Sequence, residues 1–123
     1  MADQRKILIA EDEKPLSKAL GLKLTKAGFA VTEAVDGQDA LDKAKATNFD
    51  LILLDLVMPR VDGFHFLTEF QKMGSKTPVI VVSNLGQNED IKKAKELGAV
   101  DFFIKASTPL AQILEMVKSR INP

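Results

Sequence analysis

Five polar side chains of this chain follow short apolar runs, at the points where strands of a sheet would end. Glu11 and Asp12 follow the run KILIA, and Asp55 follows LILL. Ser83 comes after VIVV, and Lys105 comes after VDFFI. Parallel strands in an open α/β sheet present their carboxyl ends along one edge, where ligands bind, so we expect these side chains to converge. The sequence therefore predicts one site that holds three carboxylates, a hydroxyl and an ammonium.

The chemistry predicted for this site is Mg²⁺ binding and phosphoryl transfer. Two unit charges about 4 Å apart repel by about 4 kcal/mol at an effective dielectric of about 20, so the acidic cluster of Glu11, Asp12 and Asp55 needs a cation. Carboxylates, water and a backbone carbonyl are ligands that suit Mg²⁺. An Asp carboxylate beside Mg²⁺ and Lys105 can attack phosphorus and form an acyl phosphate, because the cations neutralise the equatorial oxygens. Ser83 would then donate to one of those oxygens.

The elements that must position these residues form an alternating series. Apolar runs of strand length alternate with stretches of helical period, which is the order that βαβ units produce. We predict five such units, and hence an α/β fold. The runs LILL and VIVV are continuously apolar, as expected for strands covered by helices on both faces of a parallel sheet. These two strands should therefore be central.

Turn and capping residues place the five expected helices. They lie at 15–27, within DGQDALDKAKAT, at 63–73, within NEDIKKAKELG, and from Pro109 onward. Thr108 is predicted to cap the last helix, with Pro109 at its first position. The inward stripe of that helix is expected to consist of Leu110, Ile113, Leu114, Val117 and Ile121.

Composition restricts the class of protein. The chain has 123 residues, 46% hydrophobic and 28% charged, which fits one ordinary domain. Its 17 basic and 17 acidic residues balance, which argues against charge-driven binding to nucleic acid or to an anionic membrane. There is no cysteine, so thiolate metal sites and thiol nucleophiles are excluded. No apolar run approaches the roughly 20 residues of a membrane span and no signal-peptide stretch is present, so we expect a cytoplasmic protein.

The segments ILIAEDE, LILLDLVMPRVDG, VIVVSN and DFFIKA follow one another in a characteristic order and spacing. Through them the chain resembles the receiver domains of bacterial two-component response regulators. The resemblance covers essentially the whole chain, which implies one receiver domain over 1–123 and no output domain. It also implies a doubly wound (βα)5 fold of the flavodoxin-like (CheY-like) kind, with a five-stranded parallel sheet in the order 2-1-3-4-5.

The resemblance assigns roles at the acidic cluster. It implies that Asp55 is the phosphoacceptor and that Asp12 binds Mg²⁺ directly. Glu11 would hold the ion through water, and Val57 would offer its backbone carbonyl. Asp55 itself would also contribute to the metal site, so the implied cofactor is Mg²⁺.

The implied function is a phosphorylation-activated signalling switch and not an enzyme. A sensor histidine kinase or a phosphotransfer protein would donate the phosphoryl group. Ser83 would be the switch hydroxyl, Lys105 the ion-pair partner of the phosphoryl group, and Phe103 the aromatic side chain whose rotamer reports the state. Their shift would reshape the surface formed by the last two helices and the last strand. That surface would then bind an unknown protein target, or a second copy of the chain in a phosphorylation-linked homodimer. Direct binding to nucleic acid or to a membrane is not expected.

The sequence departs from the family pattern around the site. Ala106 follows Lys105 where the family usually has proline after a cis peptide, and a cis bond before a non-proline residue costs about 2.5–4 kcal/mol. We therefore expect this loop to take a different path. Asn84 is larger than the usual Ala or Gly and should restrict access to the phosphate. Val57 and Leu85 are apolar where the family often orients a hydrolytic water, which predicts a slowly hydrolysing acyl phosphate.

Three other functions compete with this interpretation. An Asp-nucleophile phosphatase needs a second acid two residues after the nucleophile, and Val57 cannot act as one. A nucleotide-binding α/β domain needs a Gly-rich loop after the first strand, where this chain has EDEKP. A receiver used only for docking, without phosphorylation, stays open as the main alternative, although the required side chains are all present.

Overall fold

The computed structural model describes residues 4–121 and contains five strands. They are β1 (Lys6–Ala10), β2 (Ala30–Ala34), β3 (Leu51–Leu54), β4 (Val79–Ser83) and β5 (Asp101–Ile104). All neighbouring strands pair in parallel, in the order β2-β1-β3-β4-β5. This confirms the α/β class and the strand order that the resemblance implied.

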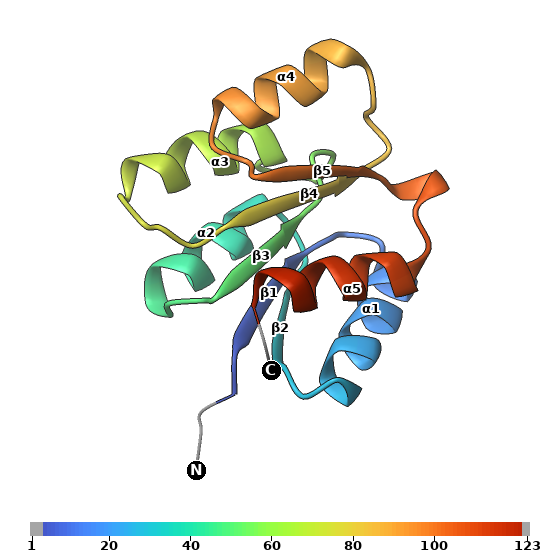
Figure 1. Ribbon diagram of the computed structural model, residues 1–123. Coiled ribbons are helices and arrows are strands. Elements are labelled where there is room, and N and C mark those ends of the chain that lie inside the picture. Colours follow the sequence, from blue (N-terminus) through green and yellow to red (C-terminus); the bar gives the residue numbers. More distant parts are fainter. Residues whose placement is uncertain (1–3, 122–123) are drawn as a thin grey trace.

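Helices cover both faces of the sheet (Figure 1). They are α1 (Lys14–Lys26), α2 (Gly37–Ala46), α3 (Gly63–Lys72), α4 (Asn88–Glu96) and α5 (Leu110–Arg120). Helices α1 and α5 lie on one face, and α2, α3 and α4 lie on the other. Within residues 4–121, every helix is too short or too polar to cross a membrane.

The sequence of strand β3 is continuously apolar because both of its faces are buried. All four of its residues are buried. Leu51 and Leu53 pack in the cluster under α1 and α5, whereas Ile52 and Leu54 pack in the cluster under α2, α3 and α4. Because successive side chains of a strand point to opposite faces, a strand with helices on both sides needs apolar residues throughout. The prediction that LILL is a central strand is confirmed.

The start of α5 differs from the prediction. The helix begins at Leu110, and the preceding Pro109 has an extended backbone, with ψ at 149° and no side-chain cap. A single 3₁₀ turn, Lys105–Ser107, first leads the chain away from β5, and Thr108 then bridges to Pro109 in an extended conformation. Thr108 is therefore not the cap, and that prediction is wrong. The inward stripe of the helix is borne out, because its members are buried or packed against the core.

Candidate functional site

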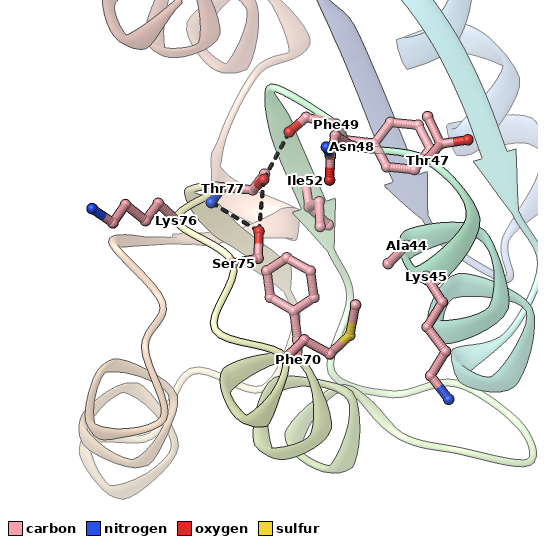
Figure 2. Close-up of a pocket in the computed structure, with 11 residues that line it drawn as sticks. Ala44, Lys45, Thr47, Asn48, Phe49, Ile52, Phe70, Ser75, Lys76 and Thr77 are labelled. Carbon is pink, nitrogen blue, oxygen red and sulfur yellow. Dashed lines mark hydrogen bonds between the residues drawn. The ribbon is translucent and has the colours of Figure 1, made fainter.

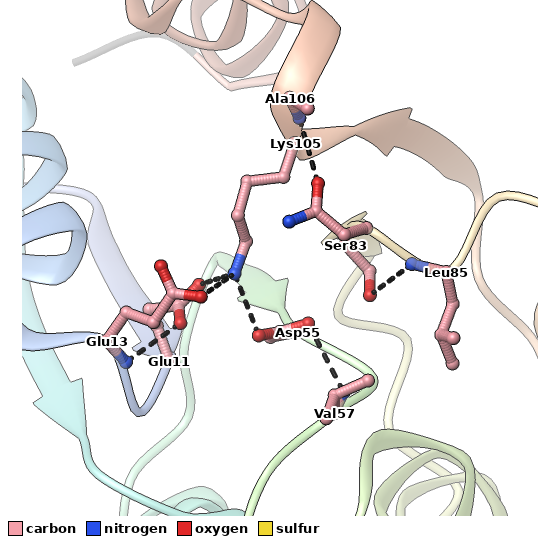
Figure 3. A network of polar contacts seen from close by, with 9 residues as sticks. Glu11, Glu13, Asp55, Val57, Ser83, Leu85, Lys105 and Ala106 are labelled. Carbon is pink, nitrogen blue, oxygen red and sulfur yellow. Dashed lines mark hydrogen bonds and ion pairs between the residues drawn. The ribbon is translucent and has the colours of Figure 1, made fainter.

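The carboxyl ends of β1, β3 and β5 bring Glu11, Asp55 and Lys105 together (Figure 3). The backbone hydrogen bonding of the sheet extends one residue beyond the ends of β1 and β3. The Glu11 N–H donates to the Ala34 carbonyl oxygen at 3.1 Å, and the Asp55 N–H donates to that of Ala10 at 2.9 Å. These backbone bonds fix the positions from which both carboxylates start. The expected convergence at one edge of the sheet is thus present.

Lys105 bridges the two buried carboxylates. Its Nζ lies 2.9 Å from Asp55 Oδ2 and 2.8 Å from Glu11 Oε1. The side chains of Lys105, Glu11 and Asp55 are only 11%, 6% and 3% exposed. Buried charges are tolerated only when they are paired and hydrogen-bonded, so the ammonium is needed to hold this pair of acids inside the protein.

Glu13 is a further acid at the site that the sequence analysis did not single out. Its Oε1 lies 3.5 Å from Lys105 Nζ, and its backbone N–H donates to Glu11 Oε2 at 3.0 Å. The Glu13 side chain is 58% exposed, so its pairing with Lys105 is weak. A third acid after the pair Glu11-Asp12 was visible in the sequence, but only the fold shows that it reaches the lysine.

The pKa values of Glu11 and Lys105 reflect this environment. Burial raises the pKa of the Glu11 carboxyl from 4.5 to about 7, although its bonds to Lys105 and to the Glu13 N–H oppose the rise. Burial alone would lower the pKa of the Lys105 ammonium, but the bonds to Glu11 and Asp55 outweigh it and hold that pKa above its ordinary value. The lysine therefore stays charged, while the buried glutamate retains a proton more readily than usual.

Three carboxylates at this edge are placed to share a cation. Glu11, Asp12 and Asp55 each offer an oxygen within 4.8 Å of the others. Asp12 and Asp55 line an open hollow of about 190 Å³, together with Glu13, Val57, Asn84 and Lys105. Hard oxygen donors beside a water-accessible hollow fit Mg²⁺, which usually keeps several of its waters. The predicted metal residues are therefore gathered at one place.

The loop after β3 is held close to Asp55. The Val57 N–H donates to Asp55 Oδ1 at 3.2 Å, which orients the carboxylate from the side opposite Lys105. At the start of α3, a Cβ on Gly63 would lie 2.5 Å from the Asp55 carbonyl oxygen and 2.6 Å from Leu56 Cα. Only glycine permits this approach of helix and strand end. The glycine that ends the segment LILLDLVMPRVDG thus has a structural reason.

Ser83 lies at the end of β4 but does not line the hollow. The residue is fully buried, and its Oγ accepts a hydrogen bond from the Leu85 N–H at 3.3 Å. Figure 3 shows this hydroxyl bonded to the Leu85 N–H. Among the described residues, the predicted switch hydroxyl bonds to the loop after β4 and makes no hydrogen bond to Glu11, Asp12 or Asp55.

The two phenylalanines of β5 point to opposite faces of the sheet. Phe103 packs against the cluster under α1 and α5, whereas Phe102 packs against the cluster under α2, α3 and α4, as does Leu85. Phe102 pairs in register with Val81. Val81 and Ser83 are two residues apart on β4, so their side chains lie on the same face of the sheet. Phe103, the predicted aromatic, is thus separated from Ser83 by the sheet. Phe102 is the aromatic residue on the face of Ser83 and α4.

The loop after Lys105 takes a path that has no cis bond. All peptide bonds in the part of the chain that the structure describes are trans. Ala106 lies in the 3₁₀ turn, and its N–H donates to Asn84 Oδ1 at 3.0 Å. Proline at position 106 would lack this N–H. The departure from the family pattern therefore creates a bond between two loops of the site.

A second hollow, of about 400 Å³, lies at the opposite edge of the sheet (Figure 2). The hydroxyl groups of Ser75 and Thr77 are already hydrogen-bonded within the protein. Thr77 Oγ1 donates to the Phe49 carbonyl oxygen at 2.7 Å, and Ser75 Oγ donates to Thr77 Oγ1 at 3.0 Å. The flanking Lys45 and Lys76 are exposed. The functional residues predicted from the sequence all lie away from this hollow.

The comparisons with known proteins agree with this geometry. The model of the response regulator receiver domain family matches residues 7–118. The chain is 37% identical over 111 residues to the chemotaxis protein CheV3 of Helicobacter pylori, with 80% of this chain and 36% of that protein covered. It is 35% identical over 119 residues to the chemotaxis protein CheY of Treponema pallidum, with 93% and 81% covered. The chain thus spans about a third of one relative and most of the other.

Among solved structures, the chain is similar to one in the CheX-CheY-BeF3-Mg+2 complex from Borrelia burgdorferi. The TM-score is 0.86 at 31% identity, with 94% of this chain and 87% of that chain covered.

Proposed function

The chain belongs to the response regulator receiver family, and on that premise we propose that it is a signalling switch phosphorylated on Asp55 in a Mg²⁺-dependent reaction. The observation that carries the proposal is the position of the Asp55 carboxylate. It adjoins the hollow at the sheet edge, 2.9 Å from Lys105 Nζ and within 4.8 Å of ligand atoms from Glu11 and Asp12. A nucleophile flanked by a fixed cation and a metal site is what phosphoryl transfer requires.

The proposed reaction uses the two oxygens of Asp55 differently. Val57 N–H and Lys105 Nζ hold Oδ1 and Oδ2, so the carboxylate presents a fixed orientation to the hollow. One carboxylate oxygen forms a bond to phosphorus as the bond from phosphorus to the donor's leaving atom breaks. Lys105 then pairs with an oxygen of the transferred group. Glu11 and Asp12 would hold Mg²⁺, which when bound supplies positive charge next to the phosphoryl oxygens.

The switch that follows would act through β4 and β5. Ser83 Oγ accepts the Leu85 N–H and keeps its own O–H free to donate, so a movement of Ser83 toward a phosphoryl oxygen would draw on the loop that carries Leu85. Leu85 and Phe102 pack against the same apolar cluster, so a shift of this loop would be felt at Phe102. We therefore propose Phe102 as the aromatic that responds on the face of α4, in place of the predicted Phe103.

The partners follow from the family. We propose a sensor histidine kinase or a phosphotransfer protein as the donor and a protein as the downstream target, with a phosphorylation-linked homodimer as one form of that target. The role is that of a signalling domain and not of an enzyme with a separate substrate. A phosphorylation-independent docking domain is the alternative.

Intact mass spectrometry tests the proposal. Wild-type protein incubated with Mg²⁺ and acetyl phosphate should gain one phosphoryl group, and EDTA should abolish the gain. Asp55→Asn should not gain it, whereas Asp42→Asn, on the exposed face of α2, should behave as wild type. If no gain occurs, the same measurement with a phosphorylated sensor kinase follows. Failure with both donors would contradict the proposal and favour the docking role.

A further inference from the structure

The loop between β4 and α4 contacts the chain on both sides of Lys105. On one side, Asn84 Oδ1 accepts the Ala106 N–H at 3.0 Å. On the other side, the Gly86 backbone packs so closely on Ile104 that a Cβ at position 86 would collide with the end of the Ile104 side chain. The residues before and after the lysine are thus both held by the loop that begins at Ser83.

The backbone around Lys105 needs such support. Strand β5 ends at Ile104, and from Lys105 onward the chain has only one 3₁₀ turn without a side-chain cap, in which Ala106 and Ser107 are exposed. A lysine side chain loses about 1.5–2 kcal/mol of rotamer freedom when it is fixed. A mobile backbone would add to that cost each time Nζ is placed on Asp55. Alanine does not restrict its own φ as proline does, but it supplies an N–H that a neighbouring side chain can hold.

We propose that Asn84 is a positioning residue for Lys105: its amide oxygen holds the Ala106 N–H and thereby fixes the turn that presents Nζ to Asp55. This inference rests on the proposed function, because phosphorylation of Asp55 is the process that the positioned lysine serves. Asn84 also lines the hollow, so its bulk alone would act as a lid. The two roles predict opposite effects of removing the side chain. A lid slows phosphorylation by small donors, so its removal raises the rate, whereas a positioning residue speeds phosphorylation, so its removal lowers the rate.

The first test compares Asn84→Ala with Asn84→Asp, which keeps an acceptor oxygen at the same place. In Asn84→Ala, the Ala106 amide should exchange with solvent faster, as measured by nuclear magnetic resonance. Phosphoryl gain from acetyl phosphate should slow about fivefold, the change that one hydrogen bond of ordinary net strength produces in an equilibrium. Asn84→Asp should restore the slow exchange of the Ala106 amide, whereas its added negative charge beside Asp12, Glu13 and Asp55 acts on the phosphorylation rate separately. Asn88→Ala, at the first position of α4, is the matched control and should change neither.

Unchanged exchange at Ala106 would overturn the proposal, as would an equal or faster rate in Asn84→Ala. A faster rate would assign the side chain the role of a lid.

A third readout does not depend on phosphorylation. Urea unfolding in EDTA should show that Asn84→Ala destabilises the wild-type background more than the Lys105→Met background, because the lost positioning matters only while the ammonium is present. Equal losses in both backgrounds would overturn the proposal. If wild-type protein gains no phosphoryl group at all, the proposed function fails, and this cycle still decides whether Asn84 acts through Lys105.

Discussion

Removal of the Lys105 ammonium should strongly destabilise the metal-free protein. Lys105→Met keeps most of the side-chain volume but leaves Glu11 and Asp55, 6% and 3% exposed, without a cation. Removing one partner of a buried pair costs about 3–5 kcal/mol. The hollow admits water beside Asp55, so we expect about 3 kcal/mol, out of the roughly 5–15 kcal/mol that stabilise such a domain. The variant should therefore fold, with a much lower unfolding midpoint.

Mg²⁺ should reverse part of that loss. A ligand that binds only the folded state stabilises it by RT ln(1 + [L]/Kd). Without the ammonium, Glu11, Asp12 and Asp55 attract a cation more strongly, so Kd for Mg²⁺ should fall. Mg²⁺ should accordingly stabilise Lys105→Met more than wild type, and the difference between the two proteins should narrow as Mg²⁺ is added.

Urea unfolding followed by far-ultraviolet circular dichroism measures both effects, since the chain has no Trp or Tyr for fluorescence. The measurement is made well above the wild-type Glu11 pKa of about 7, because losing the Lys105 bond, which lowers that pKa, raises it further in the variant. Lys72→Met is the control, because Lys72 pairs with Glu69 at the surface and such a pair is worth at most about 1 kcal/mol. A Lys105→Met loss no larger than the control's, or equal Mg²⁺ stabilisation of both proteins, would refute the reasoning.

Three further predictions concern the neighbours of this site. Val57→Asn should shorten the lifetime of the phosphorylated protein about tenfold, because a polar group there can orient a hydrolytic water; a wild-type half-life of seconds that the substitution leaves unchanged contradicts this. In EDTA, stability should fall as pH rises from 4.5 to about 7, since the folded state holds the Glu11 proton more tightly, and urea midpoints for Glu11→Gln should lack this slope. Gly63→Ala should cost about 1–3 kcal/mol by overpacking against the Asp55 backbone. Gly21→Ala, where a Cβ has ordinary contacts at 3.6 Å, should stabilise α1 by about 0.5–1 kcal/mol; equal thermal shifts for the two glycine variants would contradict the packing argument.

The sequence predicted the acidic part of the site because strand ends are well marked in an α/β chain. Continuous apolar runs identify buried parallel strands, and the first polar residue after each run must lie at the carboxyl edge. Glu11, Asp55 and Lys105 followed from that rule alone, and the structure gathers them as expected. The reach of Glu13 to Lys105 could not follow, because it depends on how the chain turns between β1 and α1.

The start of the last helix was predicted wrongly for a related reason. Thr-Pro is a common helix start, and local sequence preference favoured Thr108 as the cap. The 3₁₀ turn at Lys105–Ser107 takes precedence, since it must end β5 with Nζ directed at Asp55. After this turn Thr108 and Pro109 are extended, and the helix starts at Leu110, one residue later than predicted.

The choice between Phe102 and Phe103 shows what strand periodicity leaves undetermined. Adjacent residues of a strand face opposite sides, so one of the two had to share the face of Ser83. The sequence does not say which, because both are aromatic and β5 is only four residues long. The register decides it, since Ser83 pairs with Ile104, and Phe102 is the aromatic residue two positions before Ile104. If the response to phosphorylation passes through this face, Phe102→Ala should weaken phosphorylation-dependent partner binding while Phe103→Ala mainly lowers stability. Pull-down with beryllofluoride-treated protein, together with urea midpoints, measures both, and the reverse pattern would return the switch role to Phe103.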